Sequence, residues 1–253
     1  MKKIFFVAFI LSGCTSFFAC KKEAAVIASS SSYESITTNP GTVTGKATDS
    51  FGNILQGVDI TVEHTVWLGT YLYATTNKKG KYSIIIPSDP AGDWTAKARY
   101  SKKAYGQTYL FDMQGNTDPF AQTEATVRNF KWKLSGKKPG TNSYYGAHVD
   151  LYPFGTDAQM NKIKIVFTPL DSTLIDGSPA VSFERNVEDV AGTFMVKDVP
   201  VGRYSIKATY PGKKLLLENR HDSKGPAIKK PVVFGKYGFL GDTEYNIEFW
   251  VSE

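Results

Sequence analysis

Cysteine is nearly absent from this chain of 253 residues: the two that exist, Cys14 and Cys20, lie within the first twenty residues. We therefore expect the rest of the chain to fold without disulfides or thiol chemistry. Histidine is also rare, and its three occurrences lie far apart in the sequence. The pair Glu63-His64 has no second histidine nearby, so we predict a solvated polar strand end there and no metal site.

Long runs of basic residues are missing too. The formal net charge is +6, but lysine and arginine form nothing longer than pairs. Binding to nucleic acid needs a basic patch or stripe, so no nucleic-acid partner is predicted. Several lysines are predicted to point outward from strands, where they keep sheet faces and edges soluble rather than meet an acidic glycan. They are Lys97, Lys131, Lys133, Lys162, Lys164 and Lys207.

Catalytic motifs are the third absence. The sequence has no nucleophile elbow, phosphate-binding loop or His-Glu zinc motif. Paired carboxylates of a glycoside hydrolase cannot be found by spacing, because in a β-sandwich they come from different strands. We predict a protein that is not an enzyme and holds no cofactor or metal. A hydrolase with an unrecognised site remains open.

The N-terminus carries an export signal. A positive start, Met1–Lys3, precedes an apolar stretch, Ile4–Ala19, that is too short and too interrupted to stay as a helix across a bilayer. Cys14 and Cys20 each follow a small residue, and both places resemble the lipidation sites of bacterial lipoproteins. The tetrapeptide that ends at Cys14 is the better match to the usual motif.

Cys20 is the predicted lipid attachment site, after a signal peptide of residues 1–19. It is followed at once by Lys-Lys-Glu, which resembles the start of many mature Gram-negative lipoproteins and favours the outer membrane. Cleavage before Cys14 would leave Phe17 and Phe18 exposed on the mature chain. Cys14 stays as the alternative, and so does a plain secretory signal. The Ser/Thr-rich residues 20–41 are predicted to be a flexible tether.

Two stretches of the remaining chain share one order of features. Gly80–Tyr100 and Gly192–Tyr210 each run from a glycine through an alternating strand, a proline and a turn to a second strand that ends on tyrosine. Alternating strands separated by turns, with no helical period, indicate β-sandwiches. The prediction is an all-β fold of two tandem antiparallel β-sandwich modules, 42–135 and 145–253, joined by a Gly/Pro-rich linker.

The strands and loops of both modules can be placed by alternation. Loops are expected at Ala104–Thr126, Asp171–Val190 and Asn219–Lys230. The predicted strands of the first module are Thr42–Thr48, Gly57–Glu63, Tyr71–Thr76, Tyr82–Pro87, Trp94–Tyr100 and Val127–Leu134. Those of the second are His148–Pro153, Lys162–Pro169, Gly192–Val196, Tyr204–Tyr210 and Tyr245–Val251.

Part of the first module resembles the carboxypeptidase regulatory-like domain. The matching features are the turn Asp49–Gly52, the pair Gly57-Val58, the Gly80-x-Tyr82 hairpin and the strand that begins at Trp94. The resemblance implies a transthyretin-like sandwich with no single chemistry, because the peptidase activity of that family resides in a separate zinc domain. In the second module the segment VPVGRYSIKATY is the closest match to this family. The front half of the module fits the family poorly, which implies a divergent sandwich.

One set of aromatic residues is a candidate ligand platform. If Val66–Ala74 is a single strand, then Trp67, Tyr71 and Tyr73 face away from the core and form a surface on which sugar rings stack. A turn at Gly69 would change this register. Burial of the rings by Ala104–Thr126 or by the other module is the alternative. Trp250 is a similar case on the last strand.

These observations predict a non-catalytic lipoprotein of the cell envelope. It would be anchored to the membrane through its N-terminal lipid and would bind or scaffold a carbohydrate or an envelope protein. The alternative is a structural or assembly accessory of a larger envelope complex, which would show an exposed apolar patch or an unpaired strand edge.

Overall fold

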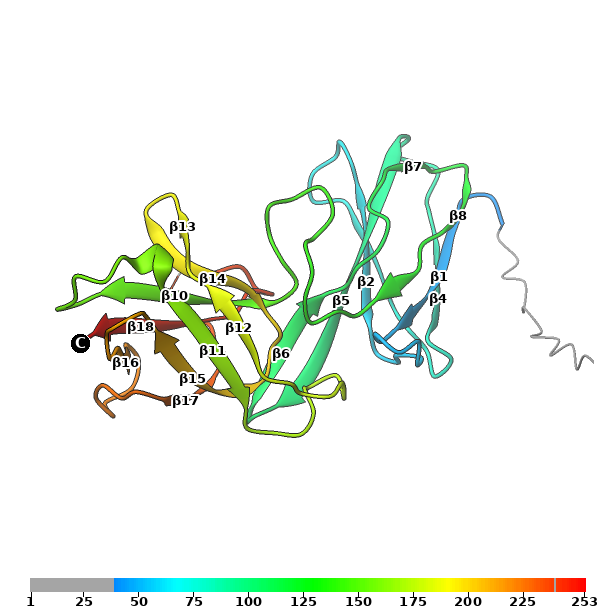
Figure 1. Ribbon diagram of the computed structural model, residues 1–253. Coiled ribbons are helices and arrows are strands. Elements are labelled where there is room, and N and C mark those ends of the chain that lie inside the picture. Colours follow the sequence, from blue (N-terminus) through cyan, green and yellow to red (C-terminus); the bar gives the residue numbers. More distant parts are fainter. Residues whose placement is uncertain (1–38, 239) are drawn as a thin grey trace, which may run out of the picture. The chain divides into compact units, whose positions relative to one another are not determined.

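The computed structural model describes residues 39–238 and 240–253, which belong to one unit (Figure 1). Apart from one 3₁₀ turn, η1 (Met160–Lys162), every regular element in these ranges is a β-strand. The all-β prediction is confirmed. The predicted signal peptide, Cys14, Cys20 and the tether up to residue 38 lie outside the described residues.

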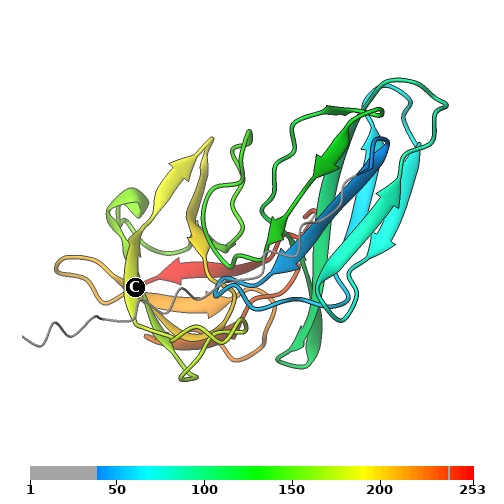
Figure 2. The ribbon, with the colours of Figure 1, turned by 90° about the vertical axis from the view of Figure 1, so that its right-hand side faces the viewer.

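The first nine strands form two facing sheets, which we call the N-terminal sandwich (Figures 1 and 2). One sheet has the order β4-β1-β8, with β9 also paired to β1; the other has the order β3-β2-β5-β6, with β7 paired to β5. The strands are β1 (Thr42–Thr48), β2 (Asp59–His64), β3 (Tyr71–Thr75), β4 (Lys81–Ile85), β5 (Asp93–Ala104), β6 (Gln107–Asp112), β7 (Phe120–Ala121), β8 (Ala125–Val127) and β9 (Phe130–Lys131).

The other nine strands form the C-terminal sandwich. Its sheets have the orders β13-β14-β10-β18-β16 and β12-β11-β15-β17. The strands are β10 (Ala147–Pro153), β11 (Lys164–Pro169), β12 (Phe183–Asn186), β13 (Glu188–Val190), β14 (Thr193–Val199), β15 (Arg203–Thr209), β16 (Leu216–Asn219), β17 (Lys230–Val233) and β18 (Asn246–Ser252).

The two sandwiches repeat one topology, which explains the sequence echo. The strands of the echo, β4 and β5, correspond to β14 and β15. β1, the first strand of the N-terminal half, pairs antiparallel with β4 and parallel with β8 and β9. In the same way β10, the first strand of the C-terminal half, pairs antiparallel with β14 and parallel with β18. The second echo strand pairs antiparallel with β2 or β11. The echo therefore marks equivalent places in two copies of a scaffold, and each copy adds parallel pairs to a mainly antiparallel arrangement.

The predicted alternation places the core correctly in the regular strands. Val58, Ile60 and Val62 are completely buried, and their neighbours along β2 face outward. The same holds for β18, where the expected inward row of Tyr245, Ile247, Phe249 and Val251 is buried. These side chains belong to one hydrophobic cluster that runs through both sandwiches. Full burial of each large apolar side chain contributes about 1.5–3 kcal/mol.

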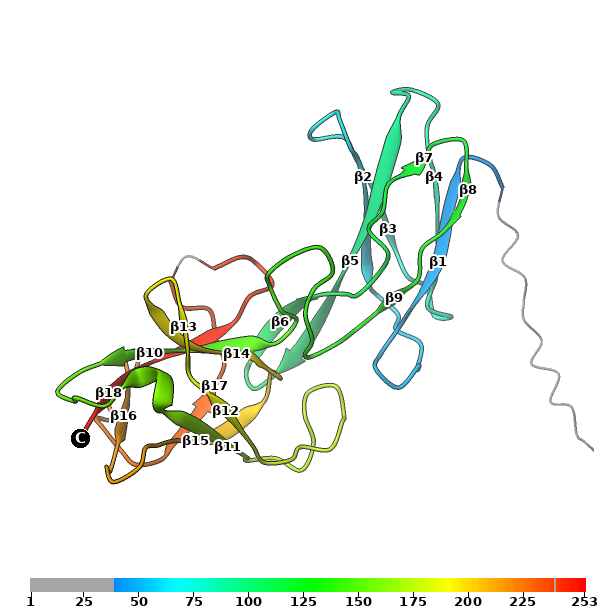
Figure 3. The ribbon, with the colours of Figure 1, turned by 45° about the horizontal axis from the view of Figure 1, so that its top comes forward.

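The β5–β6 hairpin joins the two sandwiches (Figure 3). Tyr109 on β6 is fully buried, donates its hydroxyl to the carbonyl of Phe234 (2.9 Å) and packs edge-to-face on Tyr245 at 4.9 Å between ring centroids. The Tyr245 hydroxyl accepts from the Leu110 amide (2.6 Å) and donates to the Leu110 carbonyl (3.2 Å). The outer edge of β6 is thus capped by side chains of the other half, which protects it from unwanted strand pairing.

The hairpin corrects the prediction of a loop at Ala104–Thr126. β5 continues to Ala104, and β6, β7 and the start of β8 lie inside the expected loop. The prediction of one strand over Val127–Leu134 is also wrong, because β8 and β9 are separated. The chain between them crosses β1 at Gly45, where a Cβ atom would lie 1.8 Å from the Arg128 carbonyl oxygen. Only glycine permits this approach.

The C-terminal half holds further differences. β12 and β13 lie within Asp171–Val190, which was expected to be irregular, and β11 begins at Lys164 because Lys162 belongs to η1. β16 and β17 flank the expected loop Asn219–Lys230. β12 is short and mostly exposed at a sheet edge, so it has no alternating apolar row by which it could be recognised.

We expect Tyr245→Phe to lower the free energy of unfolding by about 1–3 kcal/mol, because it leaves the Leu110 amide without its acceptor in a partly buried place. Urea denaturation measures the change. Tyr73→Phe removes a hydroxyl from an exposed ring and should change stability by less than about 0.5 kcal/mol. Equal effects of the two substitutions would contradict the assigned role of Tyr245.

Candidate functional site

The prediction of a single strand over Val66–Ala74 is wrong. β2 ends at His64 and β3 begins at Tyr71, and the connection turns at Gly69, whose φ is +84°. The turn at Gly69 leaves Tyr71 and Tyr73 on the outward face of β3, where both are exposed while Leu72 and Ala74 between them are half-buried. Trp67 lies in the turn, so only Tyr71 and Tyr73 lie on the strand.

His64 holds this turn in place. Its ring is 1% exposed, and Nδ1 accepts hydrogen bonds from the backbone amides of Val66 and Trp67, each at 3.1 Å. Nε2 lies 3.2 Å from the carbonyl oxygen of Ala91, so the proton is assigned to Nε2, and the ring packs edge-to-face on Trp94 at 4.8 Å. The expectation of a solvated polar strand end at Glu63-His64 is therefore wrong for His64.

All three predicted platform residues are exposed. The exposed fractions are 60% for Trp67, 42% for Tyr71 and 72% for Tyr73. The two tyrosine rings lie 6.1 Å apart between centroids and are tilted by 35°, so they are neighbours but not coplanar. No ring contact within residues 39–238 and 240–253 joins Trp67 to either tyrosine. We call Tyr71 and Tyr73 the tyrosine face.

Polar groups lie next to the tyrosine face on the same side of the sheet. Across the strands, Tyr71 is opposite Glu63, and Tyr73 is opposite Thr61, which in turn faces Lys97 on β5. Lys97 Nζ lies 3.0 Å from Glu63 Oε2 in a surface ion pair. Two aromatic rings beside a carboxylate, an ammonium and a hydroxyl can offer both a flat apolar surface and hydrogen bonds to one ligand.

The other aromatic and basic candidates are explained by packing. Trp250 is half-buried, with its ring 5.5 Å from Tyr152 and the guanidinium of Arg220 at 4.5 Å over it. The predicted outward lysines are all exposed or half-buried, as expected. Lys164, for example, pairs with Glu184 at 2.8 Å, a contact that stabilises an exposed surface only slightly.

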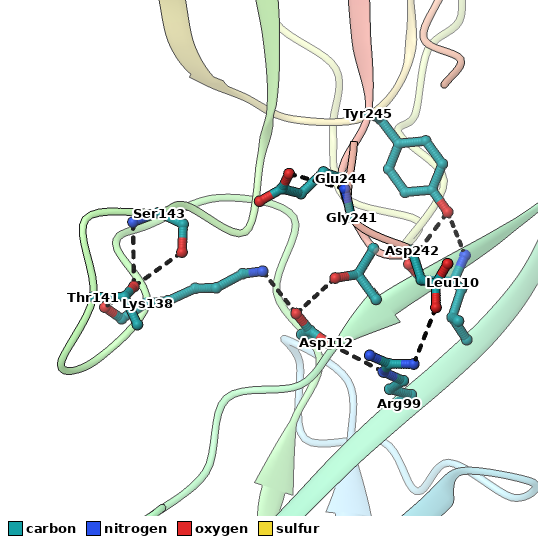
Figure 4. Close-up of polar contacts among 11 residues, drawn as sticks. Arg99, Leu110, Asp112, Lys138, Thr141, Ser143, Gly241, Asp242, Glu244 and Tyr245 are labelled. Carbon is teal, nitrogen blue, oxygen red and sulfur yellow. Dashed lines mark hydrogen bonds and ion pairs between the residues drawn. The ribbon is translucent and has the colours of Figure 1, made fainter. Parts of the chain in front are cut away.

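Sequence reasoning missed a groove beside the joint between the sandwiches. It has a volume of about 350 Å³ and is lined by side chains of β5, β6 and the linker, among them Arg99, Asp112, Lys138 and Tyr145. Asp112 is one of these lining residues, and Figure 4 shows its polar partners. It accepts hydrogen bonds from Lys138 Nζ and Thr243 Oγ1, both at 2.7 Å, and lies 3.5 Å from Arg99 Nε.

The electrostatic surroundings of Asp112 fit a carboxylate that holds neighbouring segments together, and not one that takes part in catalysis. Burial alone would raise its pKa, but hydrogen bonds from Lys138 and Thr243 and the positive charges of Lys138 and Arg99 outweigh burial and lower the pKa below 3.8. Such a carboxylate stays ionised and paired, and it is a poor general base. No sequence signal could have found it, because Lys138 and Thr243 lie 26 and 131 residues away along the chain.

Within the described ranges, no group of three or more His, Cys, Asp or Glu side chains is arranged to hold a metal ion. The same part of the chain contains no helix with the length and apolar character needed to cross a membrane. The predicted lipid site Cys20 and its alternative Cys14 fall outside it.

No protein-family model and no curated protein matches this chain. Solved structures with some similarity include the Bacillus anthracis TIE protein, at 14% identity and a TM-score of 0.30 over 85% of this chain and 34% of that one. A streptococcal ancillary pilin shares 12% identity over 81% of this chain and 62% of its own, with a TM-score of 0.26. The major pilin of Streptococcus pyogenes shares 12% identity over 84% and 97%, with a TM-score of 0.24.

The chain thus spans about a third of the TIE protein and less than two thirds of the ancillary pilin. Likeness at these TM-scores carries no argument about function. The functional conclusion has to come from the chain's own surface.

Asp112→Asn tests the polar joint through its pH dependence. Because the folded-state pKa lies below 3.8, the ionised carboxylate stabilises the fold at pH values above about 3.8, and this contribution is lost as the pH falls through the folded-state pKa. We expect the stability gap between the wild type and Asp112→Asn to be widest near pH 7 and to close as the pH falls through the folded-state pKa of Asp112, measured by urea unfolding. Asp118→Asn, at an exposed site, should show no such gap.

Proposed function

We propose that this chain is a non-catalytic lipoprotein of the cell envelope that binds a carbohydrate or a partner protein. In this proposal residues 1–19 are the export signal, Cys20 carries the lipid, residues 20–41 form the tether, and the modules 42–135 and 145–253 stand at the outer membrane. The relationship of the first module to carboxypeptidase regulatory-like domains is part of the same proposal.

The observation that supports binding most is the tyrosine face. Two neighbouring rings are exposed on an open sheet, although no core or loop requires them there. A sugar ring has an apolar C–H face that stacks on an aromatic ring, and hydroxyls that hydrogen-bond to charged groups. Glu63, Thr61 and Lys97 are the polar groups within reach of a ring stacked on Tyr71 or Tyr73. A neutral or weakly charged glycan fits this mixture better than an acidic one, because Glu63 balances Lys97.

A role as an assembly accessory has its own support. β3 is the last strand of its sheet and pairs only with β2 among the described strands. A strand with a free edge can accept an extended segment from another protein by backbone pairing. In this version Tyr71 and Tyr73 would contact side chains of the added strand.

A glycan array separates these versions. We expect the polypeptide of residues 36–253 to bind a defined set of glycans, and Tyr73→Ala and Tyr71→Ala each to weaken binding about tenfold or more through the lost stacking. Trp67→Ala measures how far the turn contributes. Phe154→Ala removes an exposed aromatic from the C-terminal sandwich and serves as the control. If no glycan binds, or if Phe154→Ala weakens binding equally, the tyrosine face is not a sugar site.

The anchor is tested by metabolic labelling with a fatty-acid analogue in a bacterial host. We expect Cys20→Ala to abolish incorporation, because the lipid is attached through that sulfur, whereas Cys14→Ala should remain labelled. The reverse pattern would assign the lipid to Cys14. Labelling of neither parent nor variants would indicate a plain secretory signal.

A further inference from the structure

The turn between β2 and β3 presents three consecutive apolar side chains to solvent. Val66 is 74% exposed, Trp67 60% and Leu68 89%. We call these three residues the apolar tip. Single exposed apolar residues are ordinary on protein surfaces, but a contiguous group of large ones marks an interaction site. Neither the core nor the tyrosine face uses Val66 or Leu68.

The tip is held in this exposed position by hydrogen bonds at its base. His64 Nδ1 accepts from the amides of Val66 and Trp67, and the Thr70 amide donates to the Trp67 carbonyl at 3.2 Å. The Thr65 amide and hydroxyl both donate to the Asp93 carbonyl, at 2.9 and 3.0 Å. These bonds fix the backbone of the turn to the neighbouring connection, and the three apolar side chains extend from this fixed backbone into solvent.

The described chain begins at the same end of the N-terminal sandwich (Figure 3). The carbonyl of Gly41 accepts from the Ile86 amide at 2.8 Å, and the segment that follows Ile86 reaches His64 through the Ala91 carbonyl. Only the residues between Cys20 and Asn39 separate this end from the proposed lipid. A chain of that length spans at most about 65 Å, so a lipid on Cys20 would keep this end of the sandwich near the bilayer.

The charges around the tip define what it can bind. The segments that form this end, residues 39–42, 64–70, 86–93 and 121–125, carry three charged side chains, Asp89, Asp93 and Glu124, and all three are acidic and exposed. They disfavour an anionic partner and leave apolar contact as the attraction. Tryptophan prefers the headgroup level of a bilayer, and aliphatic side chains prefer the acyl boundary just below it.

We propose that the apolar tip inserts into the surface of the bilayer that carries the lipid anchor, with Val66 and Leu68 at the acyl boundary and Trp67 among the headgroups. The proposal rests on the anchored function given above for its geometry. It adds a second point of attachment beside the lipid. The tyrosine face, on the side of the sheet, stays free for its ligand.

Vesicle co-sedimentation tests the tip without the anchor. The polypeptide of residues 36–253 should bind phosphatidylcholine vesicles, and Leu68→Asp should weaken the partitioning at least about tenfold. Val181→Asp makes a similar change at an exposed aliphatic residue of the C-terminal sandwich and should stay within about twofold of the wild type. Circular dichroism checks that both variants remain folded. Binding should not weaken with salt, since no basic patch contributes. The tryptophan emission should shift to the blue on binding, and this shift should be lost in Trp67→Phe.

The outcomes separate this inference from the proposed function. If the wild type does not bind vesicles, or if Leu68→Asp and Val181→Asp behave alike, the tip does not dock on lipid and serves a protein partner or none. Glycan binding that survives in Leu68→Asp would then leave the tyrosine face intact. If the protein binds no glycan but Tyr73→Ala still binds vesicles, the proposed carbohydrate ligand is wrong. The inference that the apolar tip binds the bilayer would then still stand.

Discussion

The contact of β6 with the C-terminal sandwich, made through the buried Tyr109, is the constraint on which the rest of the structure depends. Tyr109 and Tyr245 pack edge-to-face, and the Tyr245 hydroxyl bonds both backbone groups of Leu110. Because these groups would otherwise form an unpaired strand edge, each sandwich completes the other. The same contact carries the hydrophobic cluster across the joint and places Asp112 within reach of Lys138 and Thr243.

The scaffold could be predicted because its strands obey one rule. In β2 and β18 one face is buried and most residues of the other face are half-buried or exposed, so alternation in the sequence marks both the strand and its inward row. β6 alternates in burial but not in polarity. The half-buried Leu110 lies between the buried Tyr109 and Phe111, so three apolar residues follow one another in the sequence. Alternation in the sequence therefore did not mark this strand, which lies where the two sandwiches meet.

The residue types of the candidate site could be predicted from the sequence, but the directions of their side chains could not. The aromatic residues between Val66 and Ala74 drew attention by their type, but their directions depend on Gly69 and on His64, whose partners Ala91 and Trp94 come from another part of the chain. Alternation counted through the turn assigned Val66 and Leu68 to the core, whereas both are exposed. The Asp112 groove had no local pattern at all, because a polar cluster assembled from distant segments has no spacing to read.

The repeated topology shows where function separates from scaffold. The β2–β3 connection of the N-terminal sandwich corresponds to the β11–β12 connection of the C-terminal one, since β2 pairs with β3 as β11 pairs with β12. In the C-terminal copy that connection buries Ile175 and accepts a hydrogen bond from Ser50 on Asp176, so it is used to join the halves. The N-terminal copy has no such task and carries the apolar tip instead. The two connections occupy equivalent places, but only the N-terminal one exposes large apolar side chains at its turn. The fold therefore does not require Val66, Trp67 and Leu68 to be exposed, and this is why we assign them to contact with a membrane surface.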